Sequence, residues 1–479
     1  MKRKYTIHIL VVIAVLLCLI SCEKFFTQYP SNSITENNFY KTEDDFNQAV
    51  KGCYARLKTQ IGFHVTTIAY RSDECIQTTM GTSDQDKFNF DRFTENASCG
   101  IMSDIWNAWY SGIFRCNDVL DHIEGKTFDA VPQYKAEALF IRSWFYFCLY
   151  RCFGVVPLTT KVVHPDEAVL VPRCTKEQML SRLETDLTFC INNLPQQRGT
   201  EKARVTVIAA QALLGKVYLT FGEYAKAEAV LADALKDPSF GMMPTTADAF
   251  NVQNKMNKEI LFAVYYEKTN DNGHGFWWSS SSEREDRTNP TYILRDMYET
   301  GDNRRPLISE WRRLDMSDAY NKDRYVLEKW FDNYDLVYTE TVGNDFPHLR
   351  YADLYLMMAE AIGLQQDRIG EAVEYLNVTR TRAGIAPLTV SQVATRQMFI
   401  RELADERGRE FALEGQRWFD LVRLGIALDY FKSLNVEYKE GVPPITYKNI
   451  QERNLVFPIP QDQIEIVNDT DILWQNPGF

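Results

Sequence analysis

Apolar residues recur every three or four positions along most of the chain, which is the period of an amphipathic helix. This pattern predicts that helix is the dominant secondary structure. A first helix is expected to begin near Thr42, because Asp45 follows three residues later as in a capping box. The longer predicted helical stretches cover residues 104–123, 134–153, 176–193, 205–236, 349–382 and 392–424.

One of these stretches, residues 205–236, has the spacing of a tetratricopeptide helix pair. Gly215 and Ala227 are small where two antiparallel helices would approach closely, and Gly222 is placed to turn the chain between them. A generic amphipathic hairpin would explain the apolar period but not Gly215 and Ala227 together. A weaker copy at residues 356–382 predicts several helix pairs that stack as a solenoid.

The helical period is lost between about residues 238 and 347. Residues 259–266 form an apolar run that predicts a short buried strand, and residues 270–275 are polar and glycine-rich, which predicts a loop. Phe276, Trp277 and Trp278 follow and are succeeded by four serines. Large rings on a polar segment indicate a functional loop, because loops on rigid scaffolds commonly carry binding residues.

The start of the chain has the pattern of a lipoprotein signal. Three basic residues precede an apolar run over residues 7–20, which is shorter than the roughly 20 residues that span a bilayer. Ser21 then precedes Cys22, as in a bacterial lipobox. Residues 1–21 are therefore predicted to be a signal peptide, Cys22 to carry the lipid, and residues 22–38 to form a flexible tether.

Composition indicates that the remainder, residues 39–479, is water-soluble: 45% of the residues are hydrophobic and 25% are charged. Its length alone suggests two or three domains, although large single-domain helical proteins also reach this size. A net charge of −12 argues against nucleic acid or an anionic membrane surface as a partner, so that lipid does the anchoring. Eight of the ten cysteines lie between Cys53 and Cys190 without a CxxC pair, so no metal site is expected. Their spacing leaves disulfides and buried free thiols equally open.

Motifs of catalysis are missing from the sequence, which has no GxSxG, HExxH, Walker loop or GxGxxG. Glu406, Glu410 and Glu414 share one helix face, but arginines on the same segment offer local partners, and a solvated charged face is the preferred interpretation. Oxygen ligands for Ca²⁺ occur at residues 84–91 with the wrong spacing for a calcium loop. No enzyme and no cofactor are predicted.

Binding of sugars is the chemistry that the aromatic residues favour. Sugar sites pair a stacking ring with short polar side chains, because sugars present flat CH faces and many hydroxyls. Each ring has core packing as its alternative. The candidate ligand-binding residues are Trp277, Trp278, Phe88, Asn89, Phe90, Arg71 and Asp73.

Several blocks of the sequence resemble the SusD/RagB family of Bacteroidetes outer-membrane nutrient-binding lipoproteins. The most specific block includes Glu406-Arg407-Gly408-Arg409-Glu410 and ends at Leu421. The others are the start of the first helix, the paired helices with their exit turn, the motif around Arg350 and the two ends of the tail, at residues 39–42, 136–142, 153–158, 350–353, 457–460 and 475–479.

The resemblance implies a mainly α, tetratricopeptide-containing SusD-like fold with irregular loops and a few short strands. It implies that residues 39–479 form a single body, with a helical scaffold over residues 39–237 and 349–425, a variable ligand-binding loop region over residues 238–347, and a C-terminal tail over residues 426–479. It also implies that the acidic block around Glu410 belongs to the structural core.

The function implied by the resemblance is that of a cell-surface lipoprotein of the outer membrane. Such a protein captures oligosaccharide or polysaccharide and delivers it to a SusC-like TonB-dependent transporter, without catalysis. Two alternatives remain: a peptide-binding uptake protein of the RagB type, and a mainly structural lid of the transporter.

Overall fold

A computed structural model describes residues 39–76, 85–266, 274–275, 279–281, 289–309, 311–313, 324–330, 341–366, 368–434 and 447–479. The fold is mainly helical, as predicted. No helix in these ranges combines the length and apolar character needed to cross a membrane. The chain divides into two units, Met1–Gln48 and Ala49–Phe479.

The described part of the first unit leads into α2, which spans Glu43–Tyr70. The predicted capping box is present. The Asp45 carboxylate accepts a hydrogen bond from the backbone N–H of Thr42 at 2.7 Å, and the Asp45 N–H donates to the Thr42 hydroxyl at 3.2 Å. The rings of Tyr40 and Phe46 pack 5.2 Å apart beside this helix start. Local sequence alone therefore defines where the helix begins.

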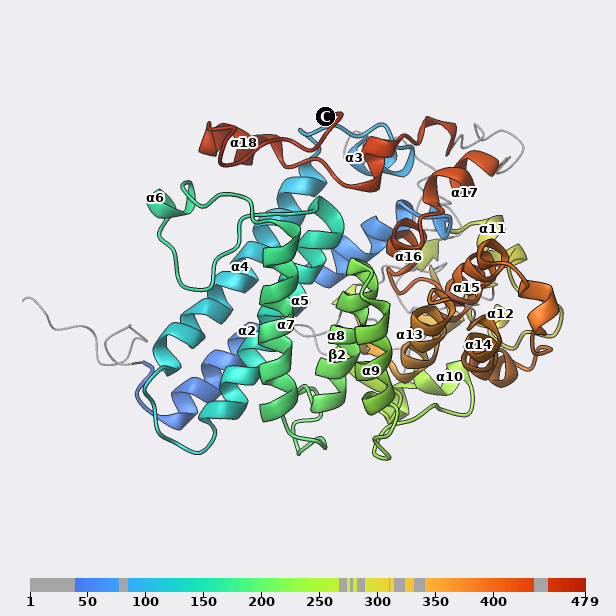
Figure 1. The fold of residues 1–479 in the computed structure, drawn as a ribbon, viewed down its shortest axis with the longest axis horizontal. Coiled ribbons are helices and arrows are strands. Elements are labelled where there is room, and N and C mark those ends of the chain that lie inside the picture. Colours follow the sequence, from blue (N-terminus) through green and yellow to red (C-terminus); the bar gives the residue numbers. More distant parts are fainter. Residues whose placement is uncertain are drawn as a thin grey trace, which may run out of the picture. The chain divides into compact units, whose positions relative to one another are not determined.

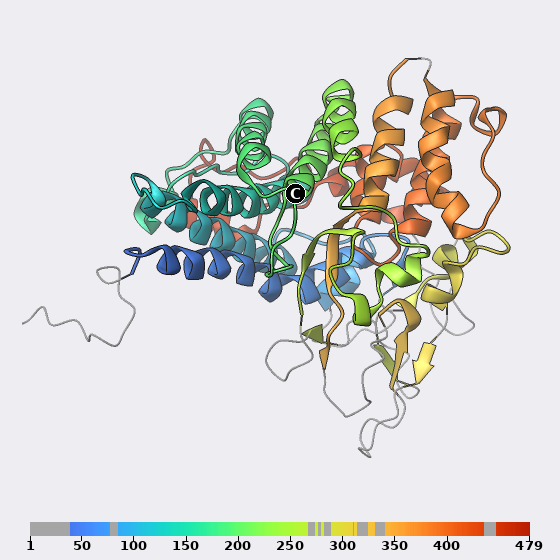
Figure 2. The same ribbon diagram turned by 90° about the horizontal axis from the view of Figure 1, so that it is seen from below.

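In the second unit, seven consecutive pairs of long helices pack against each other: α4 on α5, α5 on α7, α7 on α8, α8 on α9, α9 on α13, α13 on α14, and α14 on α15. Figures 1 and 2 show α7, α8, α9, α13 and α14 standing side by side as a layer. The layer is continuous although more than a hundred residues separate α9 from α13. The members are α4 (Gly100–Ile123), α5 (Val131–Phe153), α7 (Lys176–Asn193), α8 (Val207–Phe221), α9 (Tyr224–Ala234), α13 (Tyr351–Gly363), α14 (Ile369–Ala383) and α15 (Arg396–Glu410).

The α8–α9 pair confirms the packing predicted from its small residues. A Cβ atom on Gly215 would lie 2.6 Å from Cδ2 of Leu231, so only glycine allows this helix separation. Ala227 is fully buried in the same interface. Gly222 ends α8 in the left-handed conformation, with φ +85°, and turns the chain into α9.

Two predicted helical stretches differ from the structure: one begins later than predicted, and the other is interrupted. The stretch predicted from residue 349 begins with the end of strand β9, Phe346–Arg350, because these residues pair with β2, Ile260–Val264. The stretch predicted over residues 392–424 is broken between α15 and α16 (Arg417–Arg423). In the turn between them, Leu413 has φ +63°, a backbone conformation that an α-helix does not contain, and its N–H donates to the Glu74 carboxylate from a distant part of the chain.

Short antiparallel strands occupy the region between the helices. The strand predicted over residues 259–266 is confirmed as β2, all of whose residues are buried, and β2 and β9 lie against α8 (Figure 2). The predicted loop at residues 270–275 lies mostly outside the described residues. The other pairs are β1 (Cys75–Ile76) with β5 (Asn289–Pro290), β3 (His274–Gly275) with β8 (Thr341–Val342), and a sheet of order β4 (Ser279–Ser281), β7 (Arg324–Leu327), β6 (Trp311–Arg313).

The C-terminal segment returns to the N-terminal helices of the second unit. Its backbone N–H groups at Phe457 and Gln461 donate to Cys152 and Ala97 carbonyls at 2.6 and 2.9 Å. Figure 1 shows α18 and α3 together on the same side of the molecule. The remaining elements are α3 (Gln85–Asp91), α6 (Pro165–Ala168), α10 (Thr246–Ala249), η1 (Val252–Asn254), α11 (Tyr292–Asp296), α12 (Arg305–Ser309), η2 (Glu328–Trp330), η3 (Val390–Val393), α17 (Ala427–Ser433), η4 (Tyr447–Asn449), η5 (Glu452–Leu455) and α18 (Gln461–Val467).

Candidate ligand-binding region

The segment with the two candidate tryptophans is bounded by described strands. Trp277 and Trp278 themselves lie outside the described residues. The strand before them, β3, pairs with β8, and the strand after them, β4, pairs with β7. In sequence, the two tryptophans therefore lie between strands of two different antiparallel pairs, each of which joins distant parts of the predicted loop region.

Strand β7 leads into η2, which is fixed to the helical scaffold. The ring of Trp330 is fully buried and stacks on Phe346, with ring centroids 5.4 Å apart and planes 6° from parallel. The buried ammonium of Lys329 donates to the Ala412 carbonyl at 2.6 Å and to the Glu414 carboxylate at 2.8 Å. This short segment of the loop region is thus attached to β9 by an aromatic stack and to the segment after α15 by an ion pair.

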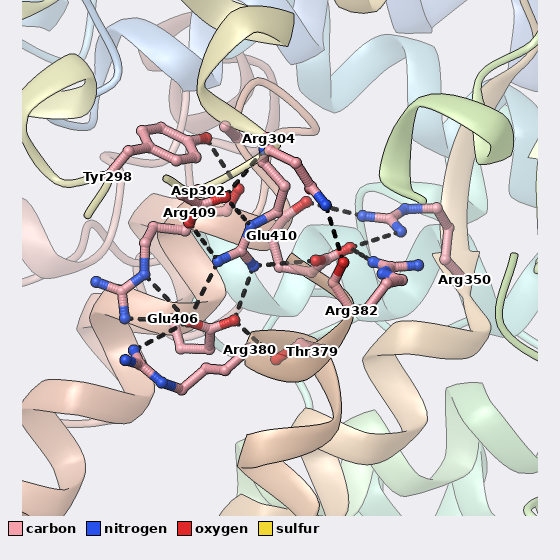
Figure 3. A network of polar contacts seen from close by, with 12 residues as sticks. Tyr298, Asp302, Arg304, Arg350, Thr379, Arg380, Arg382, Glu406, Arg409 and Glu410 are labelled. Carbon is pink, nitrogen blue, oxygen red and sulfur yellow. Dashed lines mark hydrogen bonds and ion pairs between the residues drawn. The ribbon is translucent and has the colours of Figure 1, made fainter. Parts of the chain in front are cut away.

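A larger buried ionic network joins the loop region to α14 and α15 (Figure 3). The guanidinium of Arg304, the residue before α12, binds the carboxylate of Glu406 at 2.7 Å and that of Glu410 at 3.2 Å. Arg350, at the end of β9, binds Glu410 at 3.0 Å, and Arg382 of α14 binds the same carboxylate. Elements far apart in sequence are held together by carboxylates that project from one helix.

The charges in this network remain ionised in spite of their burial. Burial alone would raise the pKa of Glu410, but Arg382, Arg350 and Arg304 outweigh it and hold that pKa well below its usual range. The pKa of Glu406 is lowered in the same way by Arg304 and Arg409. Each carboxylate is saturated by guanidinium groups, which suits a structural role.

The network corrects one interpretation of the acidic helix face. Glu406, Glu410 and Glu414 were interpreted as a solvated face with partners on their own segment, yet all three are buried. Their partners come mainly from other elements, such as Arg350 and Lys329. The sequence showed only the local arginines, so the pairing with distant ones was missed; the implied role in the structural core is confirmed.

Arg71 and Asp73 lie in the interior and not at a surface. Both side chains are fully buried. The Arg71 guanidinium forms a bidentate ion pair with Glu95, at 2.5 and 2.8 Å, and the Asp73 carboxylate pairs with Arg417. The prediction that these two side chains contact a ligand is therefore corrected: their polar groups are used by distant parts of the chain.

The three candidates on α3 are separated by burial. Phe90 is fully buried, with its ring 5.1 Å from that of Phe457. Phe88 and Asn89 are half-buried. The guanidinium of Arg92 lies 3.4 Å from the centre of the Phe88 ring. Phe88 and Asn89 thus remain at the surface, while Phe90 belongs to the core.

A polar group at the end of β2 was not identified from the sequence. The Lys255 ammonium lies 4.0 Å from the centre of the half-buried Tyr265 ring and 3.0 Å from the Asp345 carboxylate. Next to Asp345, neither amide atom of the buried Asn344 has a hydrogen-bond partner among the described residues. A tyrosine after an apolar strand was the available signal, but it was included in the predicted strand.

Metal ligands do not gather in the part of the chain that is described. No group of three or more His, Cys, Asp or Glu side chains with a suitable arrangement for a metal ion occurs there. Cys22, the predicted lipidation site, lies outside the described residues.

Comparison with known proteins places this geometry in context. The model of the SusD family matches residues 240–479, half of the chain. A second family model, for proteins described as starch-binding and associating with the outer membrane, matches residues 27–219.

Individual relatives agree with these matches. SusD-like protein P2 of Formosa agariphila is 24% identical over 520 residues, covering 100% of both chains. The starch-binding protein SusD of Bacteroides thetaiotaomicron is 34% identical over 137 residues, covering 28% of this chain and 22% of that protein. Among solved structures, a laminarin-binding SusD-like protein superposes with a TM-score of 0.72 at 25% identity, covering 92% of this chain and 100% of that one.

Proposed function

The chain belongs to the SusD family, and from this premise we propose that it is a cell-surface lipoprotein of the outer membrane that captures oligosaccharide or polysaccharide. In this proposal it delivers the glycan to a SusC-like TonB-dependent transporter and catalyses no reaction. The observation that carries the proposal is the match to the laminarin-binding SusD-like protein over 92% of the chain. The starch-binding family model over residues 27–219 supports the same class of ligand.

The proposed ligand site is the loop region between β2 and β9, with Trp277 and Trp278 as stacking rings and their neighbouring serines as hydrogen-bonding groups. Its anchoring supports this assignment. Lys329 and Arg304 are buried and paired with carboxylates of the scaffold, so the loop region is held rigidly at these two attachment points. Rigid attachment reduces the entropy that a binding loop loses when a ligand orders it.

Titration calorimetry of the purified protein against laminarin, soluble starch and other polysaccharides tests the proposal. For the polysaccharide that binds, the double variant Trp277→Ala with Trp278→Ala should lose about 1 kcal/mol or more per stacking ring. Trp474→Ala is the matched control. Trp474 is also exposed, at 40%, but it lies in the C-terminal tail, outside the proposed ligand site, where its ring packs on the Arg173 guanidinium. Equal affinity of the double variant and this control would contradict the site, and absence of glycan binding would contradict the function.

Phe88 is a second candidate for contact with the glycan, and Phe90 on the same helix is its natural comparison, because Phe88 is half-buried and Phe90 is fully buried. Phe88→Ala should weaken glycan binding with little loss of stability, because the ring is only half-buried. Phe90→Ala removes a fully buried ring from the same helix and should cost about 3–5 kcal/mol of stability instead. Unchanged affinity in Phe88→Ala at normal stability would remove α3 from the ligand site.

Peptide capture would be revealed by the same purified protein. Mass spectrometry of ligand that copurifies from native membranes should find glycan, and peptide found there in stoichiometric amount would overturn the assignment of ligand class.

A further inference from the structure

Two cysteines from different helices of the second unit lie close to each other. The thiol of Cys53 in α2 is near enough to that of Cys116 in α4 for the two to interact, and both residues are fully buried as free thiols. The Cys53 sulfur also lies 3.6 Å from the carbonyl oxygen of Arg115, the residue before Cys116. A Cβ atom on Gly52 would lie 4.0 Å from the Arg115 side chain. The two helices therefore approach closely at this pair.

The other described cysteines have different surroundings. The Cys190 thiol donates to the Ala136 carbonyl at 3.1 Å, and the Cys148 sulfur accepts from Arg151 at 3.5 Å. Cys148 and Cys152 are neighbours on one helix, where a bond between them would join no separate elements. Within the described residues, Cys53 and Cys116 are the pair whose thiols meet across two helices.

We propose that Cys53 and Cys116 are a modification site and form a disulfide bond in the exported protein. The inference rests on the proposed function to the extent that export brings the chain into an oxidising compartment. The pair is separated by 63 positions, so the bond would close a long loop and restrict the unfolded chain. It would also fasten α2, the helix that follows the proposed tether, to α4.

The oxidant required is a protein disulfide of the thiol–disulfide exchange class. One cysteine thiolate attacks that disulfide and forms a mixed disulfide. The second thiolate then displaces the oxidant, so that the Cys53–Cys116 sulfur–sulfur bond forms and the oxidant leaves as a dithiol with the two electrons and two protons. Because both thiols are buried in the folded chain, the exchange takes place during folding, before α2 and α4 close over them.

Counting thiols in the full-length lipoprotein, extracted with detergent from cells that export it, tests the inference. Eight cysteines remain after removal of Cys18 with the signal and acylation of Cys22. Alkylation in denaturant without reductant should label six of these eight, and reduction should release the other two. Peptide mapping should find Cys53 linked to Cys116.

Two variants make the count specific. Cys53→Ser should give seven labelled thiols without reductant, because Cys116 loses its partner, and the count holds even if this variant folds poorly. Cys148→Ser is the matched control, a buried helical cysteine whose loss should leave the linked pair intact and five thiols labelled. Reductant should lower the melting temperature of the wild type by a few degrees and leave that of Cys53→Ser unchanged.

Mass spectrometry of the N-terminus distinguishes the two ways of failing. Eight labelled thiols, or a link between other cysteines, in a chain with a lipidated Cys22 would overturn the disulfide alone. Ten labelled thiols in a chain that retains Met1, and with it Cys18 and an unacylated Cys22, would overturn both the disulfide and the proposed export.

Discussion

Arg417 and Asp73 form a bidentate ion pair across 344 positions of the chain, with the Nε to Oδ1 and Nη2 to Oδ2 distances both 3.0 Å. Both side chains are fully buried. The hydroxyl of Tyr430, from α17, also donates to the Asp73 carboxylate. This carboxylate, in the turn three residues after the end of α2, therefore holds α16 and α17 in place.

Removing one member of this pair should strongly destabilise the protein. Asp73→Asn removes the bidentate partner of the buried Arg417 guanidinium and leaves it only the longer contact with Asp405, at 3.3 Å, which we expect to cost about 3–5 kcal/mol in urea unfolding. Asp233→Asn is the control, because the Lys236–Asp233 pair is 74% and 63% exposed and should contribute little. If both variants unfold at the same urea concentration, the buried pair does not hold the helices together.

The Gly215–Leu231 contact should behave as a volume constraint between α8 and α9. Gly215→Leu overfills this contact and should cost about 1–3 kcal/mol. Gly199→Leu is the control, because a Cβ atom at Gly199 meets nothing within 4 Å. Adding Leu231→Ala to Gly215→Leu exchanges the two volumes and should recover part of the loss, measured as the coupling in a double-mutant cycle.

Additive losses in that cycle would show that the two side chains do not compete for the same space.

Glu74 should make stability decrease with pH in a range where acidic groups commonly do not titrate. Burial raises the pKa of its carboxyl to about 8. The neighbouring Asp73 carboxylate also raises this pKa, whereas Arg417 and Lys329 lower it. The unfolded chain has lost this proton above about pH 4.3 while the folded chain retains it, so raising the pH favours unfolding until about pH 8. The effect has a slope of up to about 1.4 kcal/mol per pH unit.

Glu74→Gln isolates this titration, since the amide oxygen can still accept from the Leu413 N–H, which Glu74 accepts at 3.0 Å. The difference in unfolding free energy between Glu74→Gln and the wild type should grow in favour of the variant from pH 5 to pH 8, measured by urea unfolding at each pH. A constant difference over that range would mean that Glu74 is ionised in the folded protein.

Local signals in the sequence were sufficient to predict those helices whose ends are fixed by capping residues next to them in sequence. The stretch predicted over residues 176–193 coincides with α7, whose start has a complete capping box between Thr175 and Gln178. The interruptions at Arg350 and Leu413 depend on pairing with β2 and with Glu74, residues that are far away in sequence. No periodicity within a window reports such partners.

The burial of the candidate site residues also depends on partners that are distant in sequence. Arg71 and Asp73 have the composition of a polar binding loop, and their burial follows from Glu95 and Arg417, which the local sequence does not identify as partners. Phe90 is buried because the returning tail places Phe457 against it. Trp277 and Trp278 lie outside the described residues, so their role stays a prediction.

Cys22 should be required for uptake and not for ligand binding. The acyl chains proposed at Cys22 would anchor the protein at about 0.8 kcal/mol per buried CH₂, while residues 22–38 act as a tether that raises the local concentration of the body near a transporter. Cys22→Ala should bind the same glycan with unchanged affinity in calorimetry, because the proposed ligand region begins more than two hundred residues later. Cells that carry this variant should take up the glycan poorly, measured by growth on that polysaccharide as the only carbon source. Ser21→Ala, which keeps a small residue before Cys22, is the control and should support normal growth. Normal growth with Cys22→Ala would show that lipid is dispensable for uptake, whatever its role in attaching the chain to the membrane.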